Sequence, residues 1–331
     1  MAPRMDGIVS VVRRSRRLQA LHSSDSSQEE DGAAATQCSA KTQVSSQKPQ
    51  KKRRKKQDKE MAANKITDDA VDCLPRTLEI KLLAEISSLQ FVMGIDEAGR
   101  GPLAGPVVAA AAIVPRDIAG IVDSKKVTHE ETRERLYEEI VASPNVRWAA
   151  AIVDASKIDE INILQATLLA MRMAATAVMV KEPDDRVIEA CVSQEGCYVV
   201  CGQRSLTDTI DFASGKRNEL GAECVYALVD GNRLPKEMPC EAEFLIKGDS
   251  KEYSIAAASI IAKVTRDRLM NAYDELYPAF GLKRHKGYPT AKHMAAVRKH
   301  GASPIHRRTF APLKHMVFDK TWKVVVEDKS S

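Results

Sequence analysis

The sequence predicts an α/β fold, because short strand-like apolar runs alternate with longer segments of helical periodicity from about Leu78 onward. The composition agrees with a folded domain, since 44% of the 331 residues are hydrophobic and 29% are charged. No stretch of the sequence approaches the roughly 18 consecutive apolar residues that a membrane-spanning helix needs. The sequence therefore predicts neither an integral membrane protein nor a wholly disordered or collagen-like one.

Five apolar runs are predicted to be strands. The first, Phe91 to Ile95, leads into Asp96 and Glu97, and a turn rich in Gly and Pro separates it from the second, Val107 to Val114. Two strands joined by a short glycine-bearing turn are expected to pair as a hairpin. The other three predicted strands are Val146 to Val153, Val225 to Val229 and Glu243 to Ile246.

Three helices are predicted between and after these strands. Ile161 to Val180 has apolar residues at helical spacing, and Ser250 to Tyr277 reads as a long helix whose Ala- and Ile-rich start is buried. Pro289 to His300 is the third. Between Lys181 and Glu223 there is no clear period, which favours a surface insertion. The seven cysteines contain no CxxC pair, which predicts free thiols in a reducing compartment and disfavours a zinc site.

The first 75 residues are predicted to be a disordered basic tail with targeting signals. From Met1 to Cys73 there are 15 Lys and Arg against 10 Asp and Glu, so this tail accounts for the whole-chain net charge of +5. Arg13 to Arg17 suits a mitochondrial presequence, whereas Lys51 to Lys56 suits a nuclear import signal or a nonspecific nucleic-acid contact. A solvated charge run without an address is a further alternative. We expect a nuclear protein, with the mitochondrion as the alternative.

Acidic residues follow three of the predicted strands, each beside glycine: Asp96 and Glu97, Asp230, and Asp249. If these strand ends converge, the carboxylates would repel one another unless a cation binds between them. Oxygen ligands without His or Cys select hard cations such as magnesium or manganese, and two such cations about 4 Å apart can promote phosphodiester hydrolysis. Because Asp also caps turns everywhere, periodicity alone leaves the metal-site and turn-capping interpretations about even.

The segment from Tyr277 to Phe318 has a one-sided charge. It contains nine Lys and Arg, five of the seven His and no Asp or Glu, so it would neutralise phosphates. Within it, Tyr288 follows a run of cations and can stack on a sugar or base. The alternatives are a C-terminal subdomain folded back on an acidic surface and an ordinary core tyrosine. Nucleic-acid binding is favoured over both.

Five blocks of this sequence resemble the ribonuclease HII family, the type 2 ribonucleases H, and occur in that family's order. They are Gly94 to Val108 (GIDEAGRGPLAGPVV), Asp123 to Lys126 (DSKK), Val229 to Asn232 (VDGN), Lys247 to Asp249 running into Ala256 to Asp267, and His285 to Tyr288 (HKGY). The resemblance covers about residues 88 to 312. Its last part, Gly301 to Pro312, is more similar to the bacterial single-subunit branch than to the catalytic subunit of the eukaryotic three-subunit complex.

The resemblance implies a ribonuclease H-like fold, with a mixed five-stranded central sheet flanked by helices and a helical C-terminal subdomain. It also implies an endoribonuclease that hydrolyses the RNA strand of RNA–DNA hybrids and incises 5′ of single ribonucleotides embedded in duplex DNA, leaving 3′-hydroxyl and 5′-phosphate ends. The family's catalytic and metal-binding carboxylates match Asp96, Glu97, Asp230 and Asp249, the acids already singled out at the strand ends. Its metals are Mg²⁺ or Mn²⁺, two ions in the active complex.

The resemblance further implies residues that bind the substrate. The family motif that senses a ribonucleotide's 2′-hydroxyl through backbone groups matches Gly99, Arg100 and Gly101, where glycine permits a close approach to the sugar. Tyr288 matches the tyrosine that stacks on the deoxyribose after the ribonucleotide. Ser124 and Lys125 match phosphate contacts, with a solvated lysine pair in a loop as the alternative. Asp267 is expected to form a structural ion pair with the nearby Arg266 or Lys263.

The expected organisation follows from these assignments. A catalytic domain spans residues 76–318, with the insertion at 181–223 and a basic substrate-binding part at 277–318, and a short tail spans 319–331. The expected partners are RNA–DNA hybrids and duplex DNA containing ribonucleotides. The enzyme is expected to act as a monomer without obligate accessory subunits, and no membrane is expected among its partners.

Overall fold

The fold was examined in a computed structural model that describes residues 74–115, 121, 129–143, 145–179, 197–202 and 220–318. The basic N-terminal tail, Ser124, Lys125, most of the 181–223 stretch and the tail after residue 318 lie outside the described residues. The expectations for those segments therefore stay predictions.

A six-stranded mixed sheet forms the centre of the described domain, with the strand order β4-β3-β2-β1-β5-β6. Its first two strands pair antiparallel, which confirms the predicted hairpin, and β1 pairs parallel with β5, as β5 does with β6. The strands are β1 (Phe91–Ala98), β2 (Val107–Ile113), β3 (Arg147–Val153), β4 (Cys197–Gly202), β5 (Val225–Asp230) and β6 (Glu241–Leu245).

The strand that the sequence did not reveal is β4. Cys197–Gly202 pairs antiparallel with β3 at one edge of the sheet, although it falls inside the stretch expected to be a surface insertion. This part of the insertion prediction was wrong, and the sheet has six strands rather than five. The run is short, and its apolar centre of Tyr198, Val199 and Val200 is bounded by cysteines and followed by glycine, so it gives little periodicity to detect.

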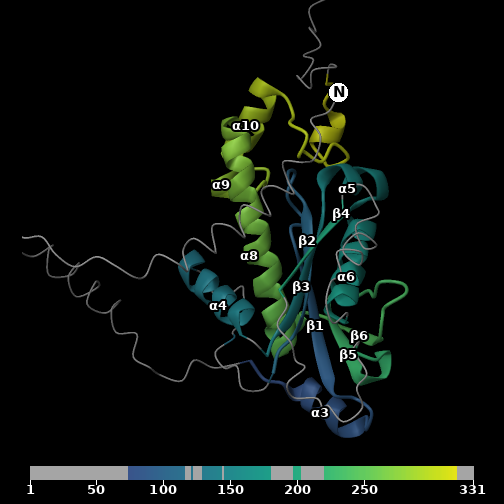
Figure 1. The fold of residues 1–331 in the computed structure, drawn as a ribbon. Coiled ribbons are helices and arrows are strands. Elements are labelled where there is room, and N and C mark those ends of the chain that lie inside the picture. Colours follow the sequence, from purple (N-terminus) through teal and green to yellow (C-terminus); the bar gives the residue numbers. More distant parts are fainter. Residues whose placement is uncertain are drawn as a thin grey trace, which may run out of the picture. The chain divides into compact units, whose positions relative to one another are not determined.

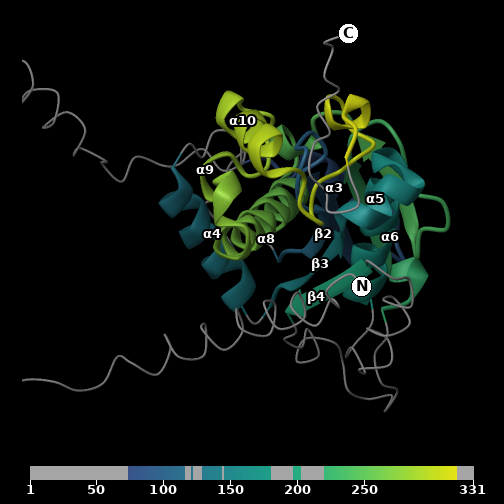
Figure 2. The same cartoon turned by 90° about the horizontal axis from the view of Figure 1, so that it is seen from above.

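Helices cover both faces of the sheet. In Figures 1 and 2, α6 lies on one face and the long α8 on the other. Asn162, whose φ is 67°, separates α5 from α6, so the helix predicted from Ile161 to Val180 begins two residues late. The helices are α3 (Thr77–Glu85), α4 (Glu130–Ala142), α5 (Ala155–Ile161), α6 (Ile163–Met179), α8 (Tyr253–Leu276), α9 (Leu282–His285) and α10 (Ala291–His300), with a one-turn 3₁₀ helix, η4 (Gly248–Ser250).

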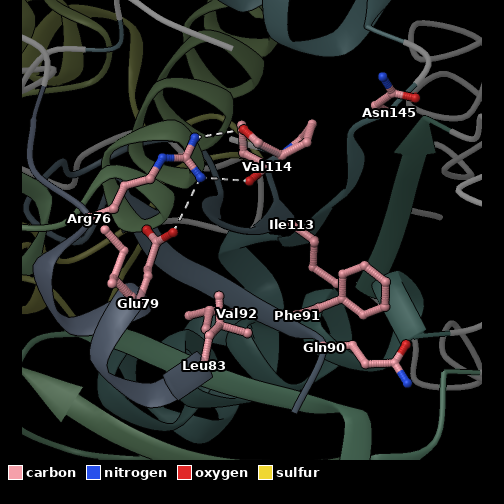
Figure 3. A pocket seen from close by; sticks show the side chains of 11 residues that line it. Arg76, Glu79, Leu83, Gln90, Phe91, Val92, Ile113, Val114 and Asn145 are labelled. Carbon is pink, nitrogen blue, oxygen red and sulfur yellow. Dashed lines mark hydrogen bonds and ion pairs between the residues drawn. The ribbon is translucent and has the colours of Figure 1, made fainter. Parts of the chain in front are cut away.

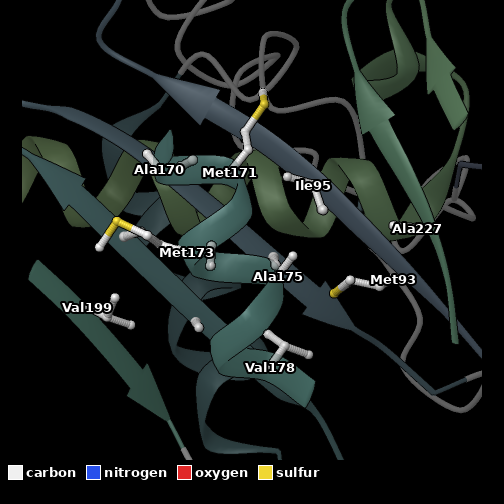
Figure 4. Packing of buried hydrophobic residues seen from close by; sticks show 14 of the residues in the cluster. Met93, Ile95, Ala170, Met171, Met173, Ala175, Val178, Val199 and Ala227 are labelled. Carbon is white, nitrogen blue, oxygen red and sulfur yellow. The ribbon is translucent and has the colours of Figure 1, made fainter. Parts of the chain in front are cut away.

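Small side chains let the helices approach the sheet closely. The main core cluster packs α6 residues such as Ala170 and Ala175 against Met93 and Ile95 of β1 (Figure 4). On the opposite face, Gly94 meets the first turn of α8, where an added Cβ would lie 2.0 Å from the carbonyl carbon of Ser254. Only glycine permits this approach, which fixes the start of α8 against the strand that carries the first acids.

A cavity of about 170 Å³ lies beside α3 (Figure 3). It is lined by this helix, by the start of β1 and by the end of β2. Arg76 spans its rim, because its guanidinium donates to the carbonyls of Val114 and Pro115 at 2.9 and 2.7 Å. Among the residues that the structure describes, no single helix is long and apolar enough to cross a bilayer. The α5–α6 pair meets that criterion only when joined across its 117° bend.

Candidate active site

Three carboxylates meet at the carboxyl ends of the neighbouring parallel strands β1 and β5. The register pairs Ile95 with Val229, so the next residues, Asp96 and Asp230, lie side by side. Asp96, Glu97 and Asp230 each offer a carboxylate oxygen within 4.8 Å of the others. The structure thus brings together three of the four acids that the sequence singled out.

The fourth acid, Asp249, reaches the same end of the sheet through the turn after β6. Lys247 adopts a left-handed conformation, with φ 58°, and η4 begins directly after it. The Gly248 N–H donates to Oδ1 of Asp230 at 2.6 Å, which ties this turn to the acidic cluster. Asp249 is buried at 1% exposure but is not one of the three acids within 4.8 Å of one another. The predicted role of Asp249 as a metal ligand stays a prediction.

Burial and mutual repulsion disfavour the charged forms of the clustered acids. Asp96 is buried, and its pKa lies well above the ordinary value because of desolvation first, then the neighbouring charges of Glu97 and Asp230. Desolvation also raises the pKa of Glu97, while Arg100, whose Nη1 donates to Glu97 Oε1 at 3.3 Å, works in the opposite direction. The cluster is therefore an unfavourable concentration of negative charge that a cation would relieve.

The donor set fits a hard divalent cation. Among the described residues the cluster contains carboxylate oxygens only, without a His or Cys ligand, which suits Mg²⁺ or Mn²⁺ rather than zinc. Asp96, Glu97 and Asp230 would hold such an ion directly, and Asp249 follows Gly248, whose N–H binds Asp230.

Four of the predicted substrate-binding residues, Gly99, Arg100, Gly101 and Tyr288, lie beside the acids, whereas Ser124 and Lys125 lie outside the described residues. Gly99 follows β1 with a φ of 95°, and a Cβ built on Gly101 would lie 3.4 Å from Cε1 of Tyr288. Tyr288 is 48% exposed, so its ring is available to a ligand instead of being buried in the core. Arg100 is half exposed and ion-paired with Glu97. The structure thus places the glycine motif, the tyrosine and the acids in one continuous region.

Two buried arginines hold this region in shape: Arg307, whose role the sequence did not predict, and Arg266, which was expected only as a possible partner of Asp267. Arg307 donates to the carbonyls of Gly99, Arg100 and Gly105 at 2.6, 3.0 and 2.9 Å. Arg266 donates to the carbonyls of residues 104, 106 and 286 at 3.0 to 3.1 Å. Both are 1% exposed or less, and burial lowers the pKa of Arg307 to about 9 and that of Arg266 to about 10. They replace water as partners of the loop's backbone.

Asp267, next to Arg266, forms the structural ion pair that the sequence predicted. Lys263 Nζ lies 2.6 Å from Asp267 Oδ1, one helical turn apart on α8. Arg266 instead turns toward the loop carbonyls. The signal that could have revealed Arg266 and Arg307 is weak, because their partners are backbone oxygens 20 to 208 residues away along the chain.

A mixed sheet flanked by helices, with carboxylates gathered at the ends of two adjacent parallel strands, defines a ribonuclease H-like hydrolase. Comparison with known proteins narrows this class. The family model for ribonuclease HII matches residues 93–313. The ribonuclease HII of Dechloromonas aromatica is 45% identical over 225 residues, covering 67% of this chain and 91% of its own. That of Marinomonas sp. is 41% identical over 226 residues, covering 68% and 92%.

The chain belongs to the ribonuclease HII family. A solved structure of ribonuclease H2 from Pyrococcus horikoshii is also similar, with 23% identity, a TM-score of 0.46, and coverage of 68% of this chain and 96% of that one. Membership supports a hydrolytic ribonuclease that acts on the RNA strand of RNA–DNA hybrids and depends on a divalent metal. The resemblance seen in the sequence is confirmed, including its similarity to bacterial relatives.

Proposed function

We propose that this protein is an endoribonuclease that, besides cutting the RNA strand of RNA–DNA hybrids, incises 5′ of single ribonucleotides embedded in duplex DNA. The products are a 3′-hydroxyl and a 5′-phosphate. The observation that supports this proposal is the continuity of the acidic cluster with the Gly99–Gly101 loop and the half-exposed Tyr288. One surface thus offers both a cleavage site and a means to read the sugar.

In the proposed reaction, Asp96, Glu97, Asp230 and Asp249 are the catalytic residues. Two divalent cations, when bound, would supply the charge that activates a water and stabilises the leaving oxygen. Asp96 and Asp230 present oxygens from adjacent strands, and the Gly248 N–H orients Asp230 through one of its oxygens. Arg100 lies within ion-pair distance of Glu97 and is exposed enough to contact a backbone phosphate as well.

The loop and the tyrosine are proposed to select the position of the cut. Backbone groups of Gly99, Arg100 and Gly101 would contact the 2′-hydroxyl, since glycine leaves room for the sugar. Tyr288 would stack on the next sugar, and deoxyribose, which has no 2′-hydroxyl, would pack against its ring most closely. Arg307 and Arg266 maintain the loop by binding its carbonyls. Ser124 and Lys125 are proposed phosphate contacts.

The enzyme is proposed to act as a monomer on its nucleic-acid substrates. The acid-free segment Tyr277 to Phe318, which includes α9 and α10, would bind the duplex beyond the cleavage site through phosphate contacts. Binding through this segment should weaken as salt concentration rises.

The test uses the full-length protein and three matched 20-base-pair duplexes, which are all DNA, DNA with one ribonucleotide, and an RNA–DNA hybrid. With Mg²⁺ or Mn²⁺ we expect cleavage of the last two only, and a single cut 5′ of the lone ribonucleotide. Cleavage of the all-DNA duplex at a similar rate would contradict the proposal, as would a cut on the 3′ side. The Asp96→Asn variant is the control for contaminating nuclease.

A further inference from the structure

Three histidines from three separate segments pack against one another next to the backbone of Tyr288. His285 ends α9, His293 lies in α10, and His306 lies in the loop that follows α10. The rings of His285 and His293 stack with centroids 4.5 Å apart, and those of His293 and His306 are 5.2 Å apart. His293 and His306 are buried at 0% and 1% exposure, so their ring nitrogens must find partners inside the protein.

The hydrogen bonds of His306 and His293 form a chain in which every donor points toward the Tyr288 carbonyl. Nδ1 of His306 lies 3.0 Å from the Ser303 amide nitrogen and 2.8 Å from the Ser303 hydroxyl oxygen. Because the amide N–H can only donate, Nδ1 accepts, and a neutral His306 then carries its proton on Nε2. That Nε2–H faces Nε2 of His293 at 3.0 Å and donates to it. His293 must then carry its own proton on Nδ1, which donates to the Tyr288 carbonyl at 2.9 Å. Each ring is held in a single tautomer.

His285 contacts the backbone just before Tyr288. The Gly287 N–H donates to its Nδ1 at 3.3 Å, so the proton of a neutral His285 is on Nε2, which donates to the Phe280 carbonyl at 2.9 Å. The Gly287 carbonyl in turn accepts from the Leu103 N–H at 2.9 Å. The Tyr288 carbonyl also accepts from the Thr290 N–H at 2.8 Å, and the Tyr288 N–H donates to the His285 carbonyl at 2.9 Å. Because Tyr288 is 48% exposed, these backbone contacts contribute to where its ring stands.

The chain of bonds requires both buried rings to stay neutral. A proton added to Nε2 of His293 would place two N–H groups face to face across the 3.0 Å contact with His306, and a proton added to Nδ1 of His306 would face the Ser303 N–H, also at 3.0 Å. Burial lowers the pKa of His293, and it lowers that of His306 to about 3, aided by the nearby His293 and His285 rings. Within the described part of the chain, the other polar groups that act on these rings are backbone groups of residues 287, 288 and 303 and the Ser303 hydroxyl, and none of these is a carboxylate that would favour the charged forms. The arrangement is intact at neutral pH.

We propose that His306 and His293 are positioning residues, which hold the Tyr288 backbone through a one-way chain of hydrogen bonds and so set the preference for a ribonucleotide joined to DNA. This inference rests on the proposed role of Tyr288 at that junction. It adds two residues that touch no substrate and act only through the tyrosine.

Two substitutions of His293 separate the two ends of the chain. An asparagine amide occupies the place of Nδ1, so His293→Asn can still donate to the Tyr288 carbonyl but loses His306. A glutamine amide reaches the place of Nε2, so His293→Gln keeps the bond with His306 and loses Tyr288. Both variants give up one of the two ring hydrogen bonds, so thermal melting should show similar losses of stability. The control is His129→Gln, an exposed residue before α4 that makes no side-chain cap bond.

The measured quantity is the ratio of kcat/KM on the single-ribonucleotide duplex to that on the hybrid. We expect His293→Gln to lower this ratio about tenfold, the effect of one lost hydrogen bond, and His293→Asn and His129→Gln to change it less than about twofold. Equal losses of the ratio in both His293 variants would overturn the inference, because the packing of the imidazole ring would then be responsible. An unchanged ratio in both variants would also overturn it, because neither hydrogen bond would then matter.

A second readout is independent of activity. Long-range ¹H–¹⁵N correlation spectra of the wild-type imidazoles at pH 7 should show the Nε2–H tautomer for His306 and the Nδ1–H tautomer for His293, assigned by the signals missing in the variants. The opposite tautomers would overturn the hydrogen-bond chain. If the wild type fails to incise the single ribonucleotide but shows these tautomers, then the proposed function fails while the hydrogen-bond chain survives.

Discussion

Removing one carboxylate from the acidic cluster should make the metal-free protein more stable while it abolishes activity. Asp96→Asn keeps the side-chain shape and an oxygen that can accept the Glu97 N–H, now bonded at 2.7 Å, but it removes the charge. Oxygens of the three acids lie within 4.8 Å of one another. At an effective dielectric constant of about 20, two full charges at that distance repel by about 3 kcal/mol.

The net gain is smaller than that repulsion, because the raised pKa of Asp96 lets the carboxyl take up a proton instead of bearing the full cost. We expect about 1–3 kcal/mol, which corresponds to a rise in Tm of roughly 3–10 °C for a domain of this size. Differential scanning calorimetry at pH 7 in the presence of a chelator measures it. The matched control is Glu85→Gln, an exposed glutamate paired with Lys81 at 4.0 Å, which should change Tm by less than about 1 °C.

The same variant should lose most of the metal response. Addition of Mg²⁺ or Mn²⁺ should raise the Tm of the wild type clearly and that of Asp96→Asn little, since a metal bound only to the folded state stabilises it. Cleavage of the hybrid should fall by more than about a hundredfold, while binding to it is retained. A Tm that falls in chelator, together with a normal metal response or full activity, would refute the reasoning that Asp96 is a strained metal ligand.

Four further predictions concern the loop, the histidines and the tail. Tyr288→Ala should reduce incision at single ribonucleotides more than cleavage of long hybrids, and equal losses in a kinetic comparison would remove its role at the junction. Arg307→Lys cannot satisfy all three loop carbonyls, so thermal unfolding should show a loss of about 2–4 kcal/mol; an unchanged Tm would contradict the role assigned to the guanidinium. Because the folded pKa of His306 is lowered from 6.5 to about 3, its contribution to stability is complete above pH 6.5 and is lost as pH falls toward 3. This loss, roughly 4 kcal/mol by pH 3, should be absent in His306→Gln when the two urea-denaturation profiles are compared. A tagged full-length protein should enter the nucleus and a form lacking residues 1–60 should not; mitochondrial import would favour the Arg13–Arg17 element instead.

The sequence predicted the strands that carry Asp96 and Asp230 because the signals for them are local. Asp96 and Asp230 each end an apolar run, and parallel strands place such ends at one edge of a sheet. The hairpin of β1 and β2 follows from a turn that is visible in the same short stretch. These features need no knowledge of distant contacts.

The features that escaped prediction depend on partners far away in the chain. From the sequence alone, Arg307 is a cation that could bind phosphates and Arg266 is a cation that could pair with a neighbouring acid. In the structure both bind backbone carbonyls that are far away in the chain. Asn162 gives no periodic sign of the break between α5 and α6, and β4 has too few residues to show an alternation. Asp249 was correctly placed at the strand ends, but its distance from the cluster depends on the conformation of Lys247, which composition does not reveal.

The three hydrogen bonds of Arg307 also bear on how the enzyme is made. The loop after β1 leaves the ribosome early, yet its carbonyls at residues 99, 100 and 105 receive a donor that is translated about 200 residues later. Since domains acquire structure during synthesis, a nascent chain can build the sheet first and complete the loop at residues 99–105 only when the segment that carries Arg307 emerges. Until then, these three carbonyls lack their buried donor.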